Sequence, residues 1–388
     1  MYCDSTCLLK ADEEYHKYEC SMMDYLHFGY SQLLPRILFK VGAAELYRIF
    51  STRDSVYFDQ KYPFGTEPDC KYDSKSYVAF YHMDKSRVLS PKSQYALTHE
   101  ALSLATIMEK HTNFFRKIPQ DRKNEFKNFV AAVTLNHAKV ISCSNWPIGE
   151  TTKVALADCH PHGNGFESIR KGVKQTATEF NMYAEGCYPL ISLMSHSCDS
   201  NVHRISDTVN GTQIIIATRA LKPGEQVTIS FGKTFGNDPY QVRQEDLHQI
   251  YGFKCECIAC RNKWPMSIQL DPKNPIFSCP SCSKKFTEES RGSPEFKKCC
   301  LTKLGGWKCG ICRKVYSERA LELQHNLNMK ISQQAEALLA HNHPYEAIML
   351  IEKVSEYFQF HLCPPYSQKY LNESVQEIAL RYLFHLSK

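Results

Sequence analysis

The chain has 388 residues, of which 43% are hydrophobic and 23% charged, and its formal net charge is +6. These values are typical of a globular protein with about two or three domains, and so mild a positive charge, without a long block of Lys or Arg, argues against direct binding to nucleic acid. No secretory segment follows Met1 and no apolar run reaches the roughly 18 residues of a membrane helix, so we expect an intracellular protein that does not enter a membrane.

Cysteine is unusually frequent, with 18 residues in the chain. Several cysteines stand at Cys-x-Cys, Cys-x2-Cys, Cys-x3-Cys or His-x3-Cys spacings, which let two side chains reach one metal ion. Disulfides are the alternative interpretation, but in a reducing compartment we expect the thiols to stay reduced. The spacings therefore predict metal sites, with zinc as the metal.

The first 20 residues carry four potential ligands, Cys3, Cys7, His16 and Cys20. The stretch from Leu8 to Tyr18 is rich in Lys, Glu and Ala and is predicted to be helical, which puts His16 and Cys20 one turn apart on the same helix face. Four such residues in this order predict a zinc-binding segment.

Residues 21–137 have the apolar spacing of helices and show no chemistry, so we interpret them as a scaffold. Predicted helices span Tyr25 to Phe50, with an interruption at Pro35, Tyr95 to His111, and Phe114 to His137. The stretch between the first two, Ser51 to Pro91, is rich in Tyr, Pro, Asp and Gly and is predicted to be a loop.

The next region begins with a short apolar segment, Ala138 to Ile141, and continues as a loop that contains Cys159, His160 and His162. Two ligand types stand close together in this loop, but no second pair lies near them. We therefore interpret it as a surface loop and not as a metal site.

A clear β signal follows. Val202 to Val209 and Thr212 to Thr218 flank Asn210-Gly211, the strongest short hairpin turn. A second turn, Lys222 to Glu225, precedes a third predicted strand from Gln226 to Phe231. Short strands around tight turns between helical regions predict an α+β protein with a small β fold, and not a parallel α/β sheet.

Two cysteine groups accompany the strands. Cys255, Cys257 and Cys260 need a fourth ligand to complete a tetrahedral zinc site, and Cys198, in a polar knot that ends the apolar run from residue 186, is a candidate. Further along, the pairs Cys279-x2-Cys282 and Cys309-x2-Cys312 fit a zinc ribbon with a somewhat long interval, and Cys299 or Cys300 could substitute as a ligand.

Residues 317–388 return to helical spacing in three predicted helices. The apolar stripes are Ala320, Leu323, Leu327, Ile331, Ala335 and Leu338, then Ala347, Ile348, Ile351, Val354 and Phe358, then Tyr370, Leu371, Val375, Ile378, Tyr382 and Phe384. The stretch His343 to Ile348 resembles the opening of a tetratricopeptide helix pair, and because one pair is not a stable array we expect it to pack on the preceding domain.

Three motifs together resemble the SET and MYND domain lysine methyltransferase family. The family's Asn-His-Ser-Cys-x-Pro-Asn stands here as Ser195 to Asn201, its Gly-Glu-Glu-x-x-Ile-x-Tyr as Gly224 to Phe231, and its post-SET Cys-x-Cys-x2-Cys as Cys255 to Cys260. Residues 1–20 match the second half of a MYND finger. The resemblance covers residues 1–20 and about 138–262 well, and the helical tail more loosely.

The resemblance implies transfer of a methyl group from S-adenosylmethionine to a protein lysine. It places Ser195, His196 and, nearby, Ser192 at the cofactor, with Asn145 as a further contact. Phe253 matches an aromatic residue that stacks on the adenine, and Tyr251 a channel tyrosine that orients the amine. The resemblance also implies that Cys198, Cys255, Cys257 and Cys260 share a structural zinc ion.

The departures from the family pattern are specific. Ser195 replaces Asn, Ser200 replaces Pro, and Phe231 stands where the family has its catalytic tyrosine. Loss of a hydroxyl aimed at the reacting centre commonly costs about 10²–10³ in rate. The family's Gly-x-Gly cofactor loop and the first four MYND ligands have no counterpart, so we expect a fragment of a longer protein or an incomplete gene model.

The predicted organisation is half a MYND finger at 1–20, a helical insert at 21–137, a SET core at 138–235, a post-SET segment at 236–262, a zinc ribbon at 263–316 and a tetratricopeptide-like helical region at 317–388. The expected substrate is a protein lysine, a histone being one candidate, and the MYND half and the helical tail would contact other proteins in the cytoplasm and nucleus. The alternative function is a catalytically silent scaffold in transcriptional regulation. A DNA-binding zinc finger is disfavoured because no helix has a basic recognition face.

Overall fold

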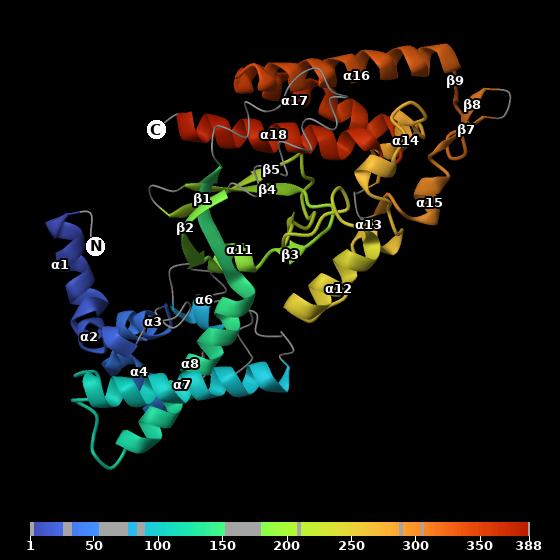
Figure 1. Cartoon of the computed structure of the whole chain (residues 1–388). Helices are drawn as coiled ribbons and strands as arrows, with labels where there is room; N and C mark the ends of the chain where they lie inside the picture. The colour runs from blue at the N-terminus through green and yellow to red at the C-terminus, as the bar shows by residue number, and fades with distance from the viewer. Residues whose placement is uncertain are drawn as a thin grey trace. The chain divides into compact units, whose positions relative to one another are not determined.

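A computed structural model of the chain describes residues 4–25, 33–53, 77–83, 90–151, 180–207, 211–286, 290–303 and 306–386 (Figure 1). They form two compact units. We call Met1–Trp146, Cys187–Leu193 and Ile250–Gly252 the helical unit, and Pro147–Gly186, Met194–Gln249 and Phe253–Lys388 the mixed unit. Helices and strands are both present, which confirms the predicted α+β class.

The N-terminal segment is a series of short helical turns, which largely confirms the predicted helix. They are α1 (Ser5–Ala11), the π-helical turn η1 (Asp12–His16), α2 (Lys17–Glu19) and the 3-10 turn η2 (Cys20–Tyr25). The side chain of Asp4 caps α1 by accepting a 2.8 Å hydrogen bond from the amide of Cys7.

The next two helices, α3 (Leu33–Val41) and α4 (Ala43–Thr52), meet at Gly42 and not at Pro35, which corrects the prediction. Pro35 lies in the first turn of α3, where its missing N–H costs no helical hydrogen bond. Gly42 has a φ of +85°, a conformation that a residue with a side chain rarely adopts, and it therefore separates the helices.

Three more helices complete the scaffold: α6 (Tyr77–Tyr81), α7 (Pro91–His111) and α8 (Lys123–Ser144). The short α6 lies in the stretch predicted to be a loop, which was wrong at these residues. The helix predicted from Phe114 to His137 begins nine residues later, and it continues through the apolar segment from Ala138 to Ile141. Phe114 and Phe115 are instead buried in the turn between α7 and α8. They pack with Phe39 and Phe126 in the core of the helical unit. The predicted loop with Cys159, His160 and His162 lies outside the described residues.

Paired strands of the chain form small sheets. They are β1 (Asn145–Thr151) with β2 (Phe180–Cys187), β3 (Ser195–His196) with β6 (Thr228–Ile229), and β4 (Val202–Asp207) with β5 (Thr212–Ala217). The predicted hairpin is confirmed, because β4 and β5 pair antiparallel from Val202 opposite Ala217 to Asp207 opposite Thr212. The strand predicted from Gln226 to Phe231 is shorter, because only Thr228 and Ile229 lie opposite β3.

The cysteine-rich part is built of short elements. They are α11 (Pro189–Ser192) in the helical unit, then α12 (Tyr240–Tyr251), α13 (Ile258–Arg261), η5 (Ser267–Gln269), α14 (Pro280–Ser283), α15 (Pro294–Lys297), and the antiparallel sheet of β7 (Leu301–Lys303), β8 (Trp307–Cys309) and β9 (Val315–Tyr316). A small antiparallel sheet whose strands accompany two cysteine pairs is consistent with the predicted zinc ribbon, and we call residues 277–316 the ribbon.

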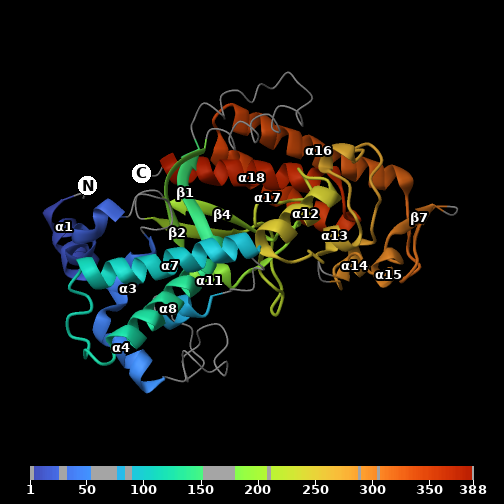
Figure 2. The same cartoon turned by 60° about the horizontal axis from the view of Figure 1, so that its bottom comes forward.

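The tail contains the three predicted helices, α16 (Glu318–Ala340), α17 (Pro344–His361) and α18 (Ser367–Leu386), which lie side by side in Figures 1 and 2. The second stripe is confirmed, since all its residues are buried. The first was wrong in part: Ala335 is buried as predicted, but Leu323 and Leu327 are 70% and 58% exposed, and α16 buries Leu321 and Leu339 instead.

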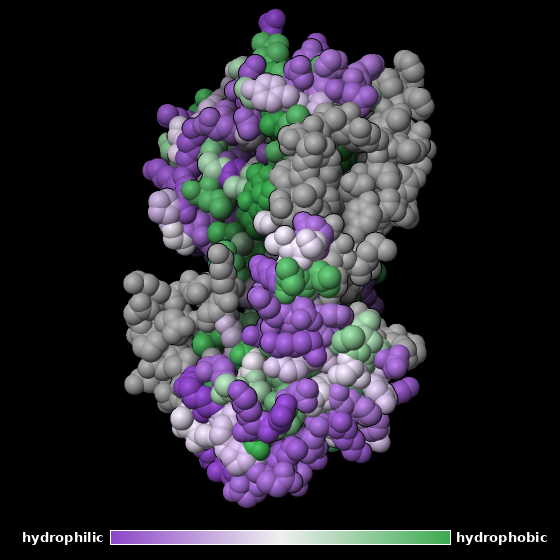
Figure 3. All heavy atoms as spheres, turned by 90° about the vertical axis from the view of Figure 1, so that its left-hand side faces the viewer, coloured by the Kyte–Doolittle hydropathy of each residue, from purple (hydrophilic) through white to green (hydrophobic). Residues whose placement is uncertain are grey.

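Cys300 and Cys363 form a disulfide, which corrects the expectation that every thiol stays reduced and removes Cys300 as a substitute metal ligand. On the face shown in Figure 3, hydrophilic and hydrophobic side chains are interspersed over the described residues. Within the described part of the chain, no helix has the length and hydropathy needed to cross a membrane.

Candidate functional site

The centre of the mixed unit is a parallel pairing of two short strands, β3 and β6. Ser195 lies opposite Thr228 and His196 opposite Ile229, and the amide of Ser197 donates a 3.1 Å hydrogen bond to the carbonyl of Ile229. Two segments about 30 residues apart are thereby joined by backbone bonds. The motif around His196 is therefore held by the strand after the second turn.

Asn201 closes this pairing with its side chain. Its Oδ1 accepts a 2.8 Å hydrogen bond from the amide of Thr228, and its Nδ2 donates a 2.9 Å bond to the carbonyl of Gln226. The residue is only 6% exposed, so both groups would lack partners without it. The last residue of the motif thus has a structural role that its type alone did not indicate.

His196 uses both ring nitrogens. Nδ1 accepts a 3.0 Å hydrogen bond from the amide of Phe231, so in the neutral ring Nε2 carries the proton, and Nε2 lies 3.3 Å from Sγ of Cys198. Burial lowers the pKa of His196 to about 4, while the charge of Cys257 raises it and that of Arg243 lowers it. The imidazole is therefore neutral at physiological pH.

Two phenylalanines flank this imidazole. The ring centroid of His196 lies 5.2 Å from that of Phe231 and 6.0 Å from that of Phe253, and the two phenylalanine rings are 6.3 Å apart at an interplanar angle of 82°. These separations are typical of interacting aromatic rings. The structure thus brings three predicted site residues into one aromatic group.

Ser195 lies at the edge of the same strand and is exposed. Its hydroxyl oxygen accepts a 2.8 Å hydrogen bond from Nε2 of Gln226. Both residues depart from the family pattern, which has Asn and Glu at these positions. The two replacements therefore form a bond with each other, a pairing that sequence inspection did not predict.

The four cysteines predicted to share a zinc ion lie close together, with Cys198 next to His196. The Sγ atoms of Cys198, Cys255, Cys257 and Cys260 all lie within 4.8 Å of one another. Gln244 holds Cys255 in place, since its side chain donates to the carbonyl of Cys255 at 2.9 Å and accepts from the amide at 3.1 Å. Four thiols at one point are compatible with zinc binding.

The electrostatics of this group favour a cation. Hydrogen bonds from the other sulfurs, that of Cys198 first, lower the pKa of Cys257, whereas hydrogen bonds to the neighbouring thiols raise the pKa of Cys198. Only some of the four can therefore carry charge together without a counter-ion. A divalent ion would stabilise all four as thiolates, so the donor set fits zinc.

A buried cation accompanies the thiols. Arg243 on α12 is 0% exposed, and its Nη1 donates a 2.6 Å hydrogen bond to the carbonyl of Asp238. Among the described residues its Nε and Nη2 have no hydrogen-bond partner. An unpaired buried guanidinium is costly, so a negative group nearby would stabilise it. Nothing in the sequence around Arg243 indicated this burial.

The remaining candidates of this set belong to the helical unit. Ser192 ends α11, where its hydroxyl donates to the carbonyl of Tyr188 at 3.1 Å; Tyr251 ends α12; and Asn145 opens β1. Their predicted roles at the cofactor and the amine stay predictions.

The other predicted metal ligands divide into two groups. Cys279, Cys282, Cys309 and Cys312 place their Sγ atoms within 4.8 Å of one another, as the ribbon prediction required. Cys3 lies outside the described residues, Cys7 and Cys20 are exposed, and His16 belongs to neither thiol group. The N-terminal zinc segment therefore stays a prediction.

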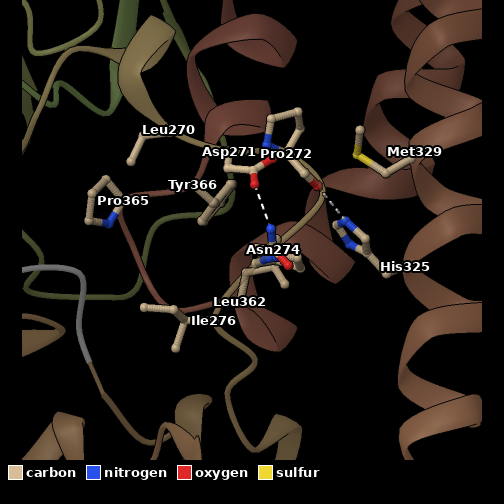
Figure 4. Close-up of a pocket in the computed structure, with 11 residues that line it drawn as sticks. Leu270, Asp271, Pro272, Asn274, Ile276, His325, Met329, Leu362, Pro365 and Tyr366 are labelled. Atoms are coloured by element: carbon tan, nitrogen blue, oxygen red, sulfur yellow. Dashed lines mark hydrogen bonds between the residues drawn. The ribbon is translucent and has the colours of Figure 1, made fainter.

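A pocket of about 100 Å³ lies between residues 270–276 and the helical tail. Figure 4 shows that polar groups of the lining form hydrogen bonds with one another. Asn274 donates to Asp271 at 2.6 Å, and Nε2 of His325 lies 3.3 Å from the carbonyl oxygen of Pro272. Leu362, Met329 and other apolar side chains supply much of the lining. The pocket was not predicted, because it combines residues from three separate segments.

Comparison with known proteins identifies the central motifs. A SET domain family model matches residues 2–232. The chain is 22% identical over 316 residues to Protein-lysine N-methyltransferase SMYD4 of Pongo abelii, which is 72% of this chain and 38% of that protein. It is 31% identical over 103 residues to Histone-lysine N-methyltransferase SMYD3 of Mus musculus, 25% of this chain and 23% of that protein. It is 32% identical over 103 residues to a SET and MYND domain-containing protein of Dictyostelium discoideum, 26% of this chain and 8% of that protein.

The chain spans 38% of the length of the SMYD4 proteins that it matches. The family match, by contrast, includes more than half of this chain and contains the β3–β6 pairing with His196 at its centre. The chain belongs to the SET domain family.

Proposed function

We propose that this chain is part of an S-adenosylmethionine-dependent protein-lysine N-methyltransferase of the SET and MYND type. The observation that carries the proposal is the aromatic group of His196, Phe231 and Phe253, held by the parallel β3–β6 pairing. Family membership and the relatives named as lysine methyltransferases support the same activity.

The residues at this place suit the cofactor's chemistry. S-adenosylmethionine has an adenine ring and polar ribose and amino-acid groups, and when bound it supplies a methyl group on a sulfonium. The half-buried ring of Phe253 would stack on the adenine, and Ser195 and His196, with Ser192 and Asn145 of the helical unit, would hold its polar groups. His196 is neutral there, so it would add no positive charge beside the sulfonium.

The protein's task toward the substrate is to present a neutral amine. A free lysine has a pKa of about 10.4, so losing its proton at pH 7 costs roughly 4–5 kcal/mol. Aromatic walls that exclude water lower this cost, because they stabilise the uncharged amine relative to the ammonium ion. Phe231 would form part of such a wall, and the hydroxyl of Tyr251 would accept a hydrogen bond from the amine and orient its lone pair.

Phe231 limits the expected rate. A tyrosine at this position would offer a hydroxyl to the reacting centre. The phenylalanine ring can still pack there, but it cannot form that hydrogen bond. Cys198, Cys255, Cys257 and Cys260 would bind a zinc ion and hold the segment with Phe253 in place. We also propose a protein substrate, a histone being one candidate, further protein contacts through the N-terminal zinc segment and the tail, and a location in cytoplasm and nucleus.

The test measures binding and transfer separately. Native mass spectrometry with S-adenosylmethionine reports cofactor stoichiometry, and transfer of a radiolabelled methyl group to histones and lysine-rich peptides reports activity. We expect one bound cofactor, slow transfer, and an increase of about 10²–10³ in rate with Phe231→Tyr.

The matched control is Phe286→Tyr, which adds the same hydroxyl in the ribbon and should leave transfer unchanged. If the cofactor binds but neither the natural chain nor Phe231→Tyr transfers methyl, the chain is a silent scaffold. If the cofactor does not bind at all, the proposed function of this chain is wrong.

A further inference from the structure

The ribbon brings two cysteine pairs together outside the SET family match. Cys279 is the N-cap of α14 and Cys282 lies within this helix, and Cys309 ends β8 three residues before Cys312. Sγ of Cys279 lies 3.6 Å from that of Cys312, and Sγ of Cys282 lies 3.9 Å from that of Cys309. Two pairs facing each other in this way are the donor set of a tetrahedral zinc ion.

The surroundings suit thiolates. The hydroxyl of Tyr316 lies 3.0 Å from Sγ of Cys279, and the amide of Ile311 donates to Sγ of Cys309 at 3.4 Å. Such donors around a metal site orient its ligands and stabilise their charge. Gly310 is required in the second turn, because a Cβ there would lie 2.8 Å from the carbonyl oxygen of Lys298. The backbone is thus shaped to direct the sulfurs toward one point.

The first cysteine pair also contacts the end of α17. The last four carbonyls of a helix have no partner within it. Here the carbonyl of Phe360 accepts hydrogen bonds from the hydroxyls of Ser278, at 2.8 Å, and Ser283, at 2.6 Å, and the carbonyl of His361 accepts a 2.8 Å bond from the amide of Ser278. The guanidinium of Arg291 donates to the carbonyl of Gln359.

Ser278 and Ser283 stand immediately outside Cys279 and Cys282, so whatever holds the cysteine pair also positions the cap. Both serines are fully buried. The carbonyls that they satisfy would otherwise be left unpaired at the junction of ribbon and tail. A metal ion on the four sulfurs would therefore influence a helix that contains none of its ligands.

We propose that Cys279, Cys282, Cys309 and Cys312 bind a structural zinc ion and that this ion holds the cap on the C-terminal end of α17. The order of the helical tail then depends on zinc. This inference goes beyond the proposed methyltransferase function, because it requires neither cofactor nor substrate.

The Cys300–Cys363 disulfide is a second tie between the ribbon and the segment after α17, and the amide of Cys363 donates to the carbonyl of Ile276 at 2.8 Å. The experiment is therefore done on the full chain under reducing conditions, so that this bond does not hold the cap in place of the metal.

The test compares two double variants. Cys309→Ser with Cys312→Ser removes half of the ligands, and Ser278→Ala with Ser283→Ala removes the cap hydroxyls but no sulfur. Native mass spectrometry counts zinc, and hydrogen–deuterium exchange reports protection in the last turn of α17. We expect the cysteine variant to lose one zinc and the serine variant to keep it, and both to exchange about tenfold or more faster in that turn.

Three results would overturn the proposal. The cysteine variant could keep the zinc count of the natural chain, it could lose a zinc with α17 protection unchanged, or the serine variant could leave that protection unchanged. Amides of α8, in the helical unit, report whether a variant has unfolded as a whole. In that case zinc is removed from the natural chain with a chelator and restored; exchange in the last turn of α17 must rise and then fall again, and an unchanged rate counts against the proposal.

Discussion

The amide of Phe231 donates a 3.0 Å hydrogen bond to Nδ1 of His196. Nε2 of the same ring lies 3.3 Å from Sγ of Cys198. The imidazole therefore connects the aromatic position of the proposed lysine channel to the thiol cluster, with one nitrogen for each. A substitution at Phe231 or in the thiol cluster should therefore affect the other through the position of the imidazole.

His196→Phe keeps a planar ring but removes both nitrogens. The amide of Phe231 then loses its acceptor, and Sγ of Cys198 loses its donor, so zinc held by the cluster should dissociate about tenfold faster or more. The measurement is the rate of zinc transfer to a coloured chelator. His248→Phe, at an exposed position on α12, is the control and should not change that rate. An equal rate in the two variants would show that the imidazole does not support the cluster.

Asn201→Ala should destabilise the mixed unit. The change leaves the amide of Thr228 and the carbonyl of Gln226, both in part-buried hydrogen bonds, without the partners described above. Each buried group that loses its partner costs about 1–3 kcal/mol, so we expect a loss of about 2–4 kcal/mol in urea unfolding. Ser200→Ala, at the half-buried neighbouring position, should cost less than about 0.5 kcal/mol. Equal losses in both variants would contradict the role assigned to Asn201.

Arg243 should matter through its charge. Four thiolates and one Zn²⁺ carry a net charge of about −2, and Arg243 and Cys257 both act electrostatically on His196. Arg243→Met keeps much of the side chain's shape and removes the charge, so zinc affinity of the Cys198 cluster should fall about tenfold or more, whereas Arg243→Lys should keep most of it. Competition with a chelator measures the affinity.

The ribbon cysteines serve as an internal reference for this measurement, because their zinc affinity should not change in either variant. Arg319→Met, at an exposed position on α16, removes a charge elsewhere in the mixed unit. If it weakens zinc binding as much as Arg243→Met does, general charge and not the buried guanidinium is responsible.

Glu336 should make stability depend on pH. Burial raises the pKa of this side chain on α16 from 4.5 to about 7, so the folded protein binds its proton more tightly than the unfolded chain does. The contribution of Glu336 to stability is therefore most favourable below pH ~4.5, falls as the pH rises to ~7 and is then constant, with a total loss of at most about 3 kcal/mol. Glu336→Gln should abolish this loss and stabilise the protein at pH 8 by about 1–3 kcal/mol.

Thermal or urea unfolding between pH 5 and 8 measures this effect. Glu322→Gln, at an exposed position on the same helix, should leave the slope unchanged. A natural chain whose stability does not fall over this range, or a Glu336→Gln variant with the same slope, would show that the carboxylate is not held in a poorly solvated place.

Local features could be predicted from the sequence because their physics is local. Asn210-Gly211 predicted the β4–β5 hairpin, since this residue pair favours the tight turn between two antiparallel strands. The Cys-x2-Cys spacings predicted which thiols form pairs, since two cysteines separated by only two residues can reach the same metal ion. The predicted apolar stripe on α17 was correct because its residues pack against apolar side chains of other elements in two buried clusters.

Other features were decided only by the tertiary structure. Cys198 meets Cys260 across 62 residues, and Cys300 meets Cys363 across 63, because folding of the intervening chain brings their sulfurs together. Leu323 and Leu327 are exposed although they fit a helical stripe, since the neighbours of α16 determine which of its faces is buried. Likewise, the neighbours of α12 and not its own sequence determine that Arg243 is buried. The sequence specified which residues could bind, turn or pack, and long-range packing specified their partners, because contact energies depend on distance in space and not on separation along the chain.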